Sequence, residues 1–156
     1  PEPLIQKEFS RIMSLKDGSK KMSKSELSDL SRINLTDNKD QIINKIKKAK
    51  TDPLPMPKTI KELDERAEAK NLLGIYSSLT SSNLEKSVET FAGKNFSEFK
   101  EKLSELLVDK LEPISIKIKK LLNDQSYLDK ILLDGADKAN IIAAEKIKKI
   151  KEIVGF

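Results

Sequence analysis

Eight consecutive residues of this chain, Gly18-Ser19-Lys20-Lys21-Met22-Ser23-Lys24-Ser25, combine three lysines, three serines and a glycine. Lysine ammonium groups are compact point charges, and serine hydroxyls and backbone N–H groups donate hydrogen bonds to anionic oxygens. Gly18 permits turn conformations that other residues avoid. The stretch therefore has the composition of a loop that binds a polyphosphate, and the alternative is a solvated basic turn.

The order of the residues in that stretch is more specific than its composition. Lys21-Met22-Ser23-Lys24-Ser25 reproduces letter for letter the KMSKS signature of class I aminoacyl-tRNA synthetases. Further segments make the chain resemble bacterial tryptophanyl-tRNA synthetase: Arg11-Ile12-Met13-Ser14-Leu15, Ile33-Asn34-Leu35-Thr36-Asp37, Ala49-Lys50-Thr51-Asp52, Asn71-Leu72-Leu73-Gly74-Ile75-Tyr76, Phe91-Ala92-Gly93-Lys94, Leu111-Glu112-Pro113-Ile114 and Asp134-Gly135-Ala136-Asp137-Lys138-Ala139. The resemblance covers only the C-terminal half of that family's chain. Because the sequence also begins Pro1-Glu2-Pro3 without an initiator Met, we expect a piece of a longer enzyme.

The resemblance implies a full-length enzyme that activates L-tryptophan with ATP and transfers it to tRNA(Trp). It implies that Lys21 and Lys24 are the catalytic residues, which contact the phosphates of ATP. Ile12 and Met22 would lie near the adenine, and Ser23 and Ser25 would add hydrogen bonds. We expect Mg²⁺ to arrive with ATP and no protein-bound metal. The HIGH-type motif and the tryptophan pocket belong to the other half of such an enzyme, so we expect this piece alone to be inactive.

The C-terminal helices of the resembled family contact tRNA across a homodimer. The resemblance therefore makes four lysines candidate tRNA contacts: Lys117, Lys120, Lys148 and Lys149. The alternative is an ordinary solvated face, because any surface helix carries charges opposite its apolar stripe. Lys20 has the same two interpretations, as a third phosphate contact or as a solvated neighbour of the motif.

The composition excludes several classes of chemistry. The 156 residues carry a formal net charge of +5 and include no cysteine and no histidine, which excludes disulfides, thiolate catalysis and serine–histidine catalysis. The sequence has neither an apolar run of the roughly 20 residues that a membrane span needs nor the layout of a signal peptide. We therefore expect a cytoplasmic protein without a membrane partner.

Hydrophobic periodicity predicts a mainly α fold, an antiparallel helix bundle preceded by a short strand-loop piece. By resemblance, that piece belongs to an α/β Rossmann-type catalytic domain that is largely absent. The predicted division is 1–35 for the edge of the catalytic domain, 36–57 for a connecting helix and Pro-rich linker, and 58–156 for a helical tRNA/anticodon-binding domain.

Local signals predict where individual elements begin and end. We expect a strand at 12–15, a helix capped by Thr36 or Asp37, and one helix across 63–79. Ser82 with Glu85 forms a predicted capping box. Pro113 should kink or split a long helix, and Gly135 should separate two shorter ones.

Two other functions are compatible with the sequence. One is a different class I synthetase, whose amino-acid pocket would also lie outside this chain. The other is a non-catalytic helical module that binds RNA or another protein.

Overall fold

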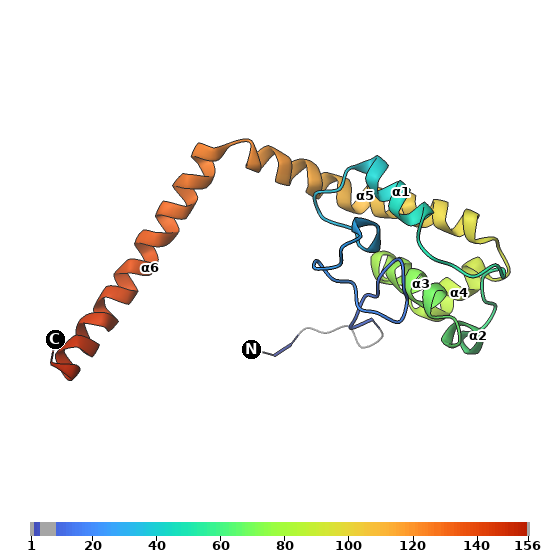
Figure 1. Cartoon of the computed structure of the whole chain (residues 1–156), viewed down its shortest axis with the longest axis horizontal. Helices are drawn as coiled ribbons and strands as arrows, with labels where there is room; N and C mark the ends of the chain where they lie inside the picture. Colours follow the sequence, from blue (N-terminus) through green and yellow to red (C-terminus); the bar gives the residue numbers. More distant parts are fainter. Residues whose placement is uncertain (1, 4–8, 156) are drawn as a thin grey trace. The chain divides into compact units, whose positions relative to one another are not determined.

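A computed structural model describes residues 2–3 and 9–155. Its helices are η1 (Asp29–Ser31), α1 (Lys39–Lys47), α2 (Ile60–Asp64), α3 (Ala67–Thr80), α4 (Leu84–Phe91), α5 (Phe96–Leu122) and α6 (Gln125–Val154) (Figure 1). The predicted mainly helical fold class is confirmed. The chain divides into two compact units, residues 1–115 and 116–156, and each is described here by itself.

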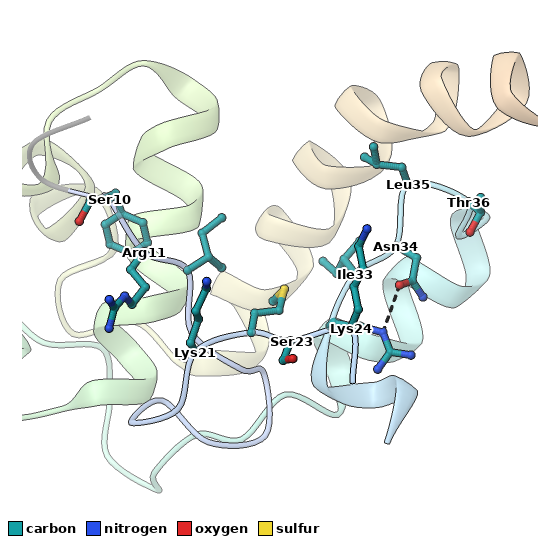
Figure 2. A pocket seen from close by; sticks show the side chains of 13 residues that line it. Ser10, Arg11, Lys21, Ser23, Lys24, Ile33, Asn34, Leu35 and Thr36 are labelled. Atoms are coloured by element: carbon teal, nitrogen blue, oxygen red, sulfur yellow. Dashed lines mark hydrogen bonds between the residues drawn. The ribbon is translucent and has the colours of Figure 1, made fainter. Parts of the chain in front are cut away.

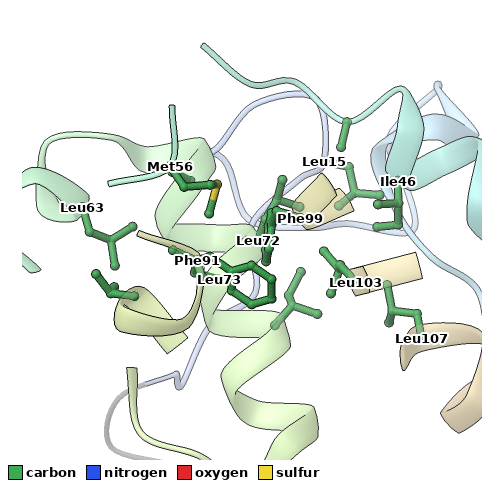
Figure 3. Close-up of a cluster of buried hydrophobic side chains, with 14 of the residues drawn as sticks. Leu15, Ile46, Met56, Leu63, Leu72, Leu73, Phe91, Phe99, Leu103 and Leu107 are labelled. Atoms are coloured by element: carbon green, nitrogen blue, oxygen red, sulfur yellow. The ribbon is translucent and has the colours of Figure 1, made fainter. Parts of the chain in front are cut away.

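One apolar core holds the first unit together (Figure 3). Leu15 from the N-terminal segment, Met56 from the Pro-rich segment and Phe99 from α5 are each almost completely buried in it. The rings of Tyr76, Phe91 and Phe99 pack edge to face, with centroids 4.8 to 6.2 Å apart. Tyr76 is partly buried and packs against this core. Residues from all three predicted segments contribute to this core, and their division into domains stays a prediction.

The predicted strand at 12–15 is wrong. Within the described residues its only β pairing is one antiparallel bridge between Met13 and Lys21. The other edge of Met13 is bonded to the side chain of Asn71 instead of a neighbouring strand. A side chain thus takes the place that a further strand would occupy on this edge.

The first helix begins later than predicted, because Asp37 has another role. Asn38 is the N-cap of α1 and forms a capping box with Gln41. The Asp37 carboxylate is buried and accepts a hydrogen bond from Lys45 Nζ at 2.6 Å. A similar shift occurs at α4, where Asn83 caps the helix and Ser82 bonds to neighbouring hydroxyls.

The single helix predicted across 63–79 is two helices, α2 and α3. Arg66 separates them with a non-helical backbone, at φ −125° and ψ 82°. Its guanidinium forms a bidentate ion pair with Asp52, at 2.6 and 2.8 Å, and donates to the carbonyl of Pro55. The break thus coincides with a contact to a residue 14 positions away, which no local pattern reveals.

The break predicted at Gly135 does not occur, and of the kink or split predicted at Pro113 the split does not occur. Pro113 lies inside α5 and Gly135 inside α6. Both Pro113 and the residue four positions before it, Asp109, are exposed, so water can reach the carbonyl that proline leaves without a partner. A helical glycine costs only about 1 kcal/mol relative to alanine, which a helix as long as α6 can absorb.

The second unit comprises the end of α5 and the whole of α6. Considering only the described residues, α6 buries no side chain, although its apolar stripe includes Ile131, Ile147 and Ile150. A stripe of this kind indicates which face favours burial, but it does not specify what covers that face.

Phe99→Ala should destabilise the first unit by about 3–5 kcal/mol, because it removes a completely buried ring that two other aromatic rings contact. Urea denaturation followed by circular dichroism measures the change. Leu27→Ala is the control, since Leu27 is fully exposed and its truncation should change stability by less than about 0.5 kcal/mol. Equal effects of the two substitutions would contradict this description of the core.

Candidate functional site

A short hairpin presents the lysine-rich stretch. The backbone N–H of Ser14 donates to the carbonyl of Lys20 at 2.8 Å, and that of Met22 donates to the carbonyl of Ile12 at 3.0 Å. Between these two bonds, Met13 and Lys21 face each other in the antiparallel bridge. The hairpin therefore places Ile12 next to the start of the motif.

Helix α3 holds the outer edge of this hairpin. In this bridge the N–H and C=O of Met13 point away from Lys21, as they do in every non-hydrogen-bonded antiparallel pair. The Asn71 carboxamide forms a hydrogen bond with each of these groups. Its Oδ1 accepts from Met13 N and its Nδ2 donates to Met13 O, each at 2.9 Å. Asn71 is 3% exposed, so water does not compete for these bonds.

The turn of the hairpin rests on the first residues of α3. A Cβ on Gly18 would lie 2.7 Å from the backbone of Ala67 and Glu68, so only glycine fits there without a shift. The Lys50 ammonium pairs with Glu68 at 2.8 Å. The hydrogen bond from Lys50 lowers the pKa of the Glu68 carboxyl, although burial raises it. A hydrogen bond from the N–H of Gly18 lowers this pKa further.

Within the turn, Asp17 organises the residues before the motif. The hydroxyl and the N–H of Ser19 donate to its Oδ1 at 2.6 and 3.0 Å, and these bonds lower the pKa of the Asp17 carboxyl. Lys20 pairs with the other oxygen at 3.5 Å. Lys20 thus has a carboxylate partner within its own turn.

A buried polar network fixes the segment opposite the hairpin. Lys45 is 3% exposed, and its Nζ lies 2.6 Å from both Asp37 and Asp29. Asn34 donates from its backbone to Asp37 and from its side chain to Asp29, each at 2.9 Å. Arg32 donates to Asn34 and pairs with Asp29 at 3.1 Å. Residues 29–37 are therefore anchored to α1 by charged hydrogen bonds.

A pocket of about 720 Å³ lies between the hairpin and this anchored segment (Figure 2). Its lining residues are Phe9, Ser10, Arg11, Ile12, Lys21, Met22, Ser23, Lys24, Arg32, Ile33, Asn34, Leu35 and Thr36. Among the described residues, the lining combines apolar side chains with hydroxyls and four cations, and it includes no carboxylate. Such a surface suits a ligand with one flat apolar part and one anionic part.

The structure brings most of the predicted ATP residues together. Ile12, Lys21, Met22, Ser23 and Lys24 line the pocket. Ser25 does not line it, and its hydroxyl lies 2.9 Å from that of Ser23. No described carboxylate is within ion-pair distance of Lys21 or Lys24, so both ammonium groups are available to an anion. Their roles toward ATP remain predictions.

Sequence reasoning missed the other half of the lining. Arg11, Ile33 and Asn34 lie in segments that carried the family resemblance, but nothing in their spacing assigned them to the lysine-rich stretch. Phe9 and Ser10 carried no signal. The fold joins these residues because the hairpin and residues 32–36 face each other (Figure 2).

The four predicted tRNA lysines are exposed and lie in the second unit. Lys117 and Lys120 are on α5, and Lys148 and Lys149 are on α6. Lys149 pairs with Glu145 on the same helix at 2.7 Å. An exposed position suits both a phosphate contact and a solvated face, so their role also stays a prediction.

Comparison with known proteins identifies the family. A model of the tRNA synthetases class I (W and Y) matches residues 1–128. The chain belongs to this family. Two relatives named tryptophan–tRNA ligase, from Caulobacter vibrioides and Rickettsia felis, are each 51% identical over 156 residues and all of this chain. A solved tryptophanyl-tRNA synthetase from Mycoplasma pneumoniae matches 74% of the chain with a TM-score of 0.61 and 29% identity.

The chain covers only part of each of these proteins. It spans 45% of the Caulobacter relative, 47% of the Rickettsia relative and 36% of the solved Mycoplasma chain. No helix within the described residues is long and apolar enough to cross a membrane.

Glu68→Gln should reduce the amount by which the free energy of unfolding falls between neutral and acid pH. Because the folded state lowers the pKa of Glu68, its charge adds stability above the ordinary value of 4.5, and this stability is lost as the pH falls below that value. Urea denaturation at about pH 7 and about pH 3.5 measures the difference. Glu89→Gln, at an exposed position of α4, is the control. Parallel pH profiles for wild type and Glu68→Gln would contradict the assignment.

Proposed function

We propose that this chain is the C-terminal part of a tryptophan–tRNA ligase and that its pocket is one wall of the ATP site. The observation that carries the proposal is the convergence of Lys21, Lys24 and Arg11 on one pocket, whose described lining residues include no carboxylate. Family membership and relatives that are 51% identical to this chain over its 156 residues support the same activity.

The cations would act on the charge that moves during amino-acid activation. A carboxylate oxygen of tryptophan attacks the α-phosphorus of ATP, a new P–O bond forms, and the bond to the bridging oxygen breaks. The electron pair leaves with pyrophosphate, so negative charge grows on the departing group. Lys21 and Lys24 would meet that charge, and a well-placed donor is worth about 3 kcal/mol in comparable sites.

The apolar part of the lining would hold the base. Ile12 and Met22 lie on adjacent strands of the hairpin, because the Met22 N–H donates to the Ile12 carbonyl. Met22 also packs against the core, which fixes its position. These two side chains are where we place the adenine, with the phosphates toward Lys21 and Lys24. ATP would enter as its Mg²⁺ complex.

The remaining assignments follow from the proposed activity. Tryptophan as the amino acid and tRNA(Trp) as the acceptor are supported by the names of the relatives. We propose a homodimer in the cytoplasm, with Lys117, Lys120, Lys148 and Lys149 as phosphate contacts for tRNA. Their exposure and positive charge support that role.

Lys21→Ala and Lys24→Ala in the full-length protein test the catalytic role. Each should lower the rate of tryptophan-dependent pyrophosphate exchange by about 10²–10³-fold, because each removes a cation from the developing charge. The affinity for tryptophan should change little. Kinetics with varied ATP and tryptophan separate the two effects.

Lys20→Ala is the matched control for both variants. Lys20 is the same residue type in the same loop, but it pairs with Asp17 and does not line the pocket. Its substitution should leave exchange within about twofold of wild type. Unchanged exchange in Lys21→Ala and Lys24→Ala would overturn the proposal and favour the non-catalytic RNA-binding module.

The isolated 156-residue chain should show no tryptophan-dependent pyrophosphate exchange. It supplies phosphate contacts and spans less than half of its relatives, so the tryptophan pocket would have to come from the remaining length. The full-length protein at the same concentration is the positive control. Exchange by the isolated chain would show that it holds a complete site.

A further inference from the structure

We infer that Asn71 is a positioning residue for the two lysines of the motif, and that α3 is the platform that fixes their loop. This inference rests on the proposed function. Asn71 itself lines no part of the pocket, and its effect would be transmitted through the backbone of Met13.

Three contacts arrange the N-terminal segment along one face of α3. Gly18 packs on Ala67 and Glu68 at the start of the helix. Met13 is bonded to Asn71 one turn later. Phe9 occupies the space above Gly74, where an added Cβ would overlap its ring at 1.6 Å. Positions 67, 71 and 74 share one helical face, so the segment runs antiparallel to α3 over two turns.

The chemistry of the carboxamide fits its role. Met13 presents an unpaired N–H and an unpaired C=O on the same edge, and a buried backbone group without a partner is costly. Among side chains, only those of asparagine and glutamine carry a carboxamide, which offers an N–H donor and a C=O acceptor side by side in one plane. Asparagine at position 71 therefore pairs both groups of Met13 in the way that a neighbouring strand would.

The path from Asn71 to the lysines is short. Met13 faces Lys21 directly across the bridge. The flanking bonds Ser14 to Lys20 and Met22 to Ile12 transmit the position of one strand to the other. The positions of the Lys21 and Lys24 ammonium groups thus depend on a backbone that Asn71 holds in place. Misplacement by about 1 Å is enough to cost an enzyme about 10²-fold.

The main test is Asn71→Ala in the full-length protein. We expect the rate of tryptophan-dependent pyrophosphate exchange to fall roughly tenfold to a hundredfold and the KM for ATP to rise, with the KM for tryptophan unchanged. Ser77→Ala is the matched control, because Ser77 is also a buried polar residue of α3 with a hydrogen bond to backbone, the Ser82 carbonyl. It should lower the melting temperature without changing either KM.

Gly18→Ala provides a second variant that makes no hole in the core. Its Cβ would press on the backbone of α3, so it should raise the KM for ATP and lower the exchange rate in the same sense as Asn71→Ala. Normal ATP kinetics in both Gly18→Ala and Asn71→Ala would overturn the inference. Equal losses in Asn71→Ala and Ser77→Ala would also overturn it, because they would indicate general destabilisation.

Limited trypsin digestion gives a readout that is independent of catalysis. Trypsin should cleave after Lys20, Lys21 and Lys24 at least several-fold faster in Asn71→Ala than in wild type or Ser77→Ala, since the hairpin loses its outer partner. Unchanged cleavage would overturn the positioning role. A wild-type protein that lacks exchange activity would instead refute the proposed function, and the digestion would still decide whether Asn71 holds the loop.

Discussion

Two hydrogen bonds between the Asn71 carboxamide and the backbone of Met13 are the constraint on which the candidate site depends. They replace the neighbouring strand that a one-pair bridge lacks, and they attach the hairpin to a helix that the core holds in place. Gly18 and Gly74 extend the attachment, since a side chain at either position would collide with α3 or with Phe9. The motif therefore belongs to a hairpin whose backbone is attached to α3.

The other wall of the pocket, formed by residues 32–36, is also held in position, but by a different interaction. Lys45 is buried with Asp37 and reaches Asp29, and Asn34 connects both carboxylates to the segment that lines the pocket. A buried ion pair adds little net stability, but removing one partner leaves an unpaired charge and is costly. The network thus specifies the conformation of residues 29–37. Both walls are held by buried polar groups, and the ammonium groups of Lys21 and Lys24 stay available for a ligand.

The pocket offers groups that favour a negatively charged ligand. It has cations, hydroxyls and apolar surface, but the chain has no histidine or cysteine, and no carboxylate lines the part of the pocket that the structure describes. Such a set can stabilise negative charge that develops on a leaving group, and it offers no histidine, cysteine or described carboxylate to act as a general base. This agrees with the proposal that the chain, which spans less than half of its relatives, contributes one wall of an ATP site.

The sequence by itself determined the family, the helical class and the chemistry of the motif, because these depend on residues that are close together in the chain. The tertiary structure decided what depends on distant residues. Arg66 separates α2 from α3 where it contacts Asp52, and α5 and α6 continue through Pro113 and Gly135. Asn71 and Met13 are 58 positions apart, and no local pattern links them. The residue types that suit an anion site could be recognised in the sequence, but the backbone contacts that position them became visible only in the folded chain.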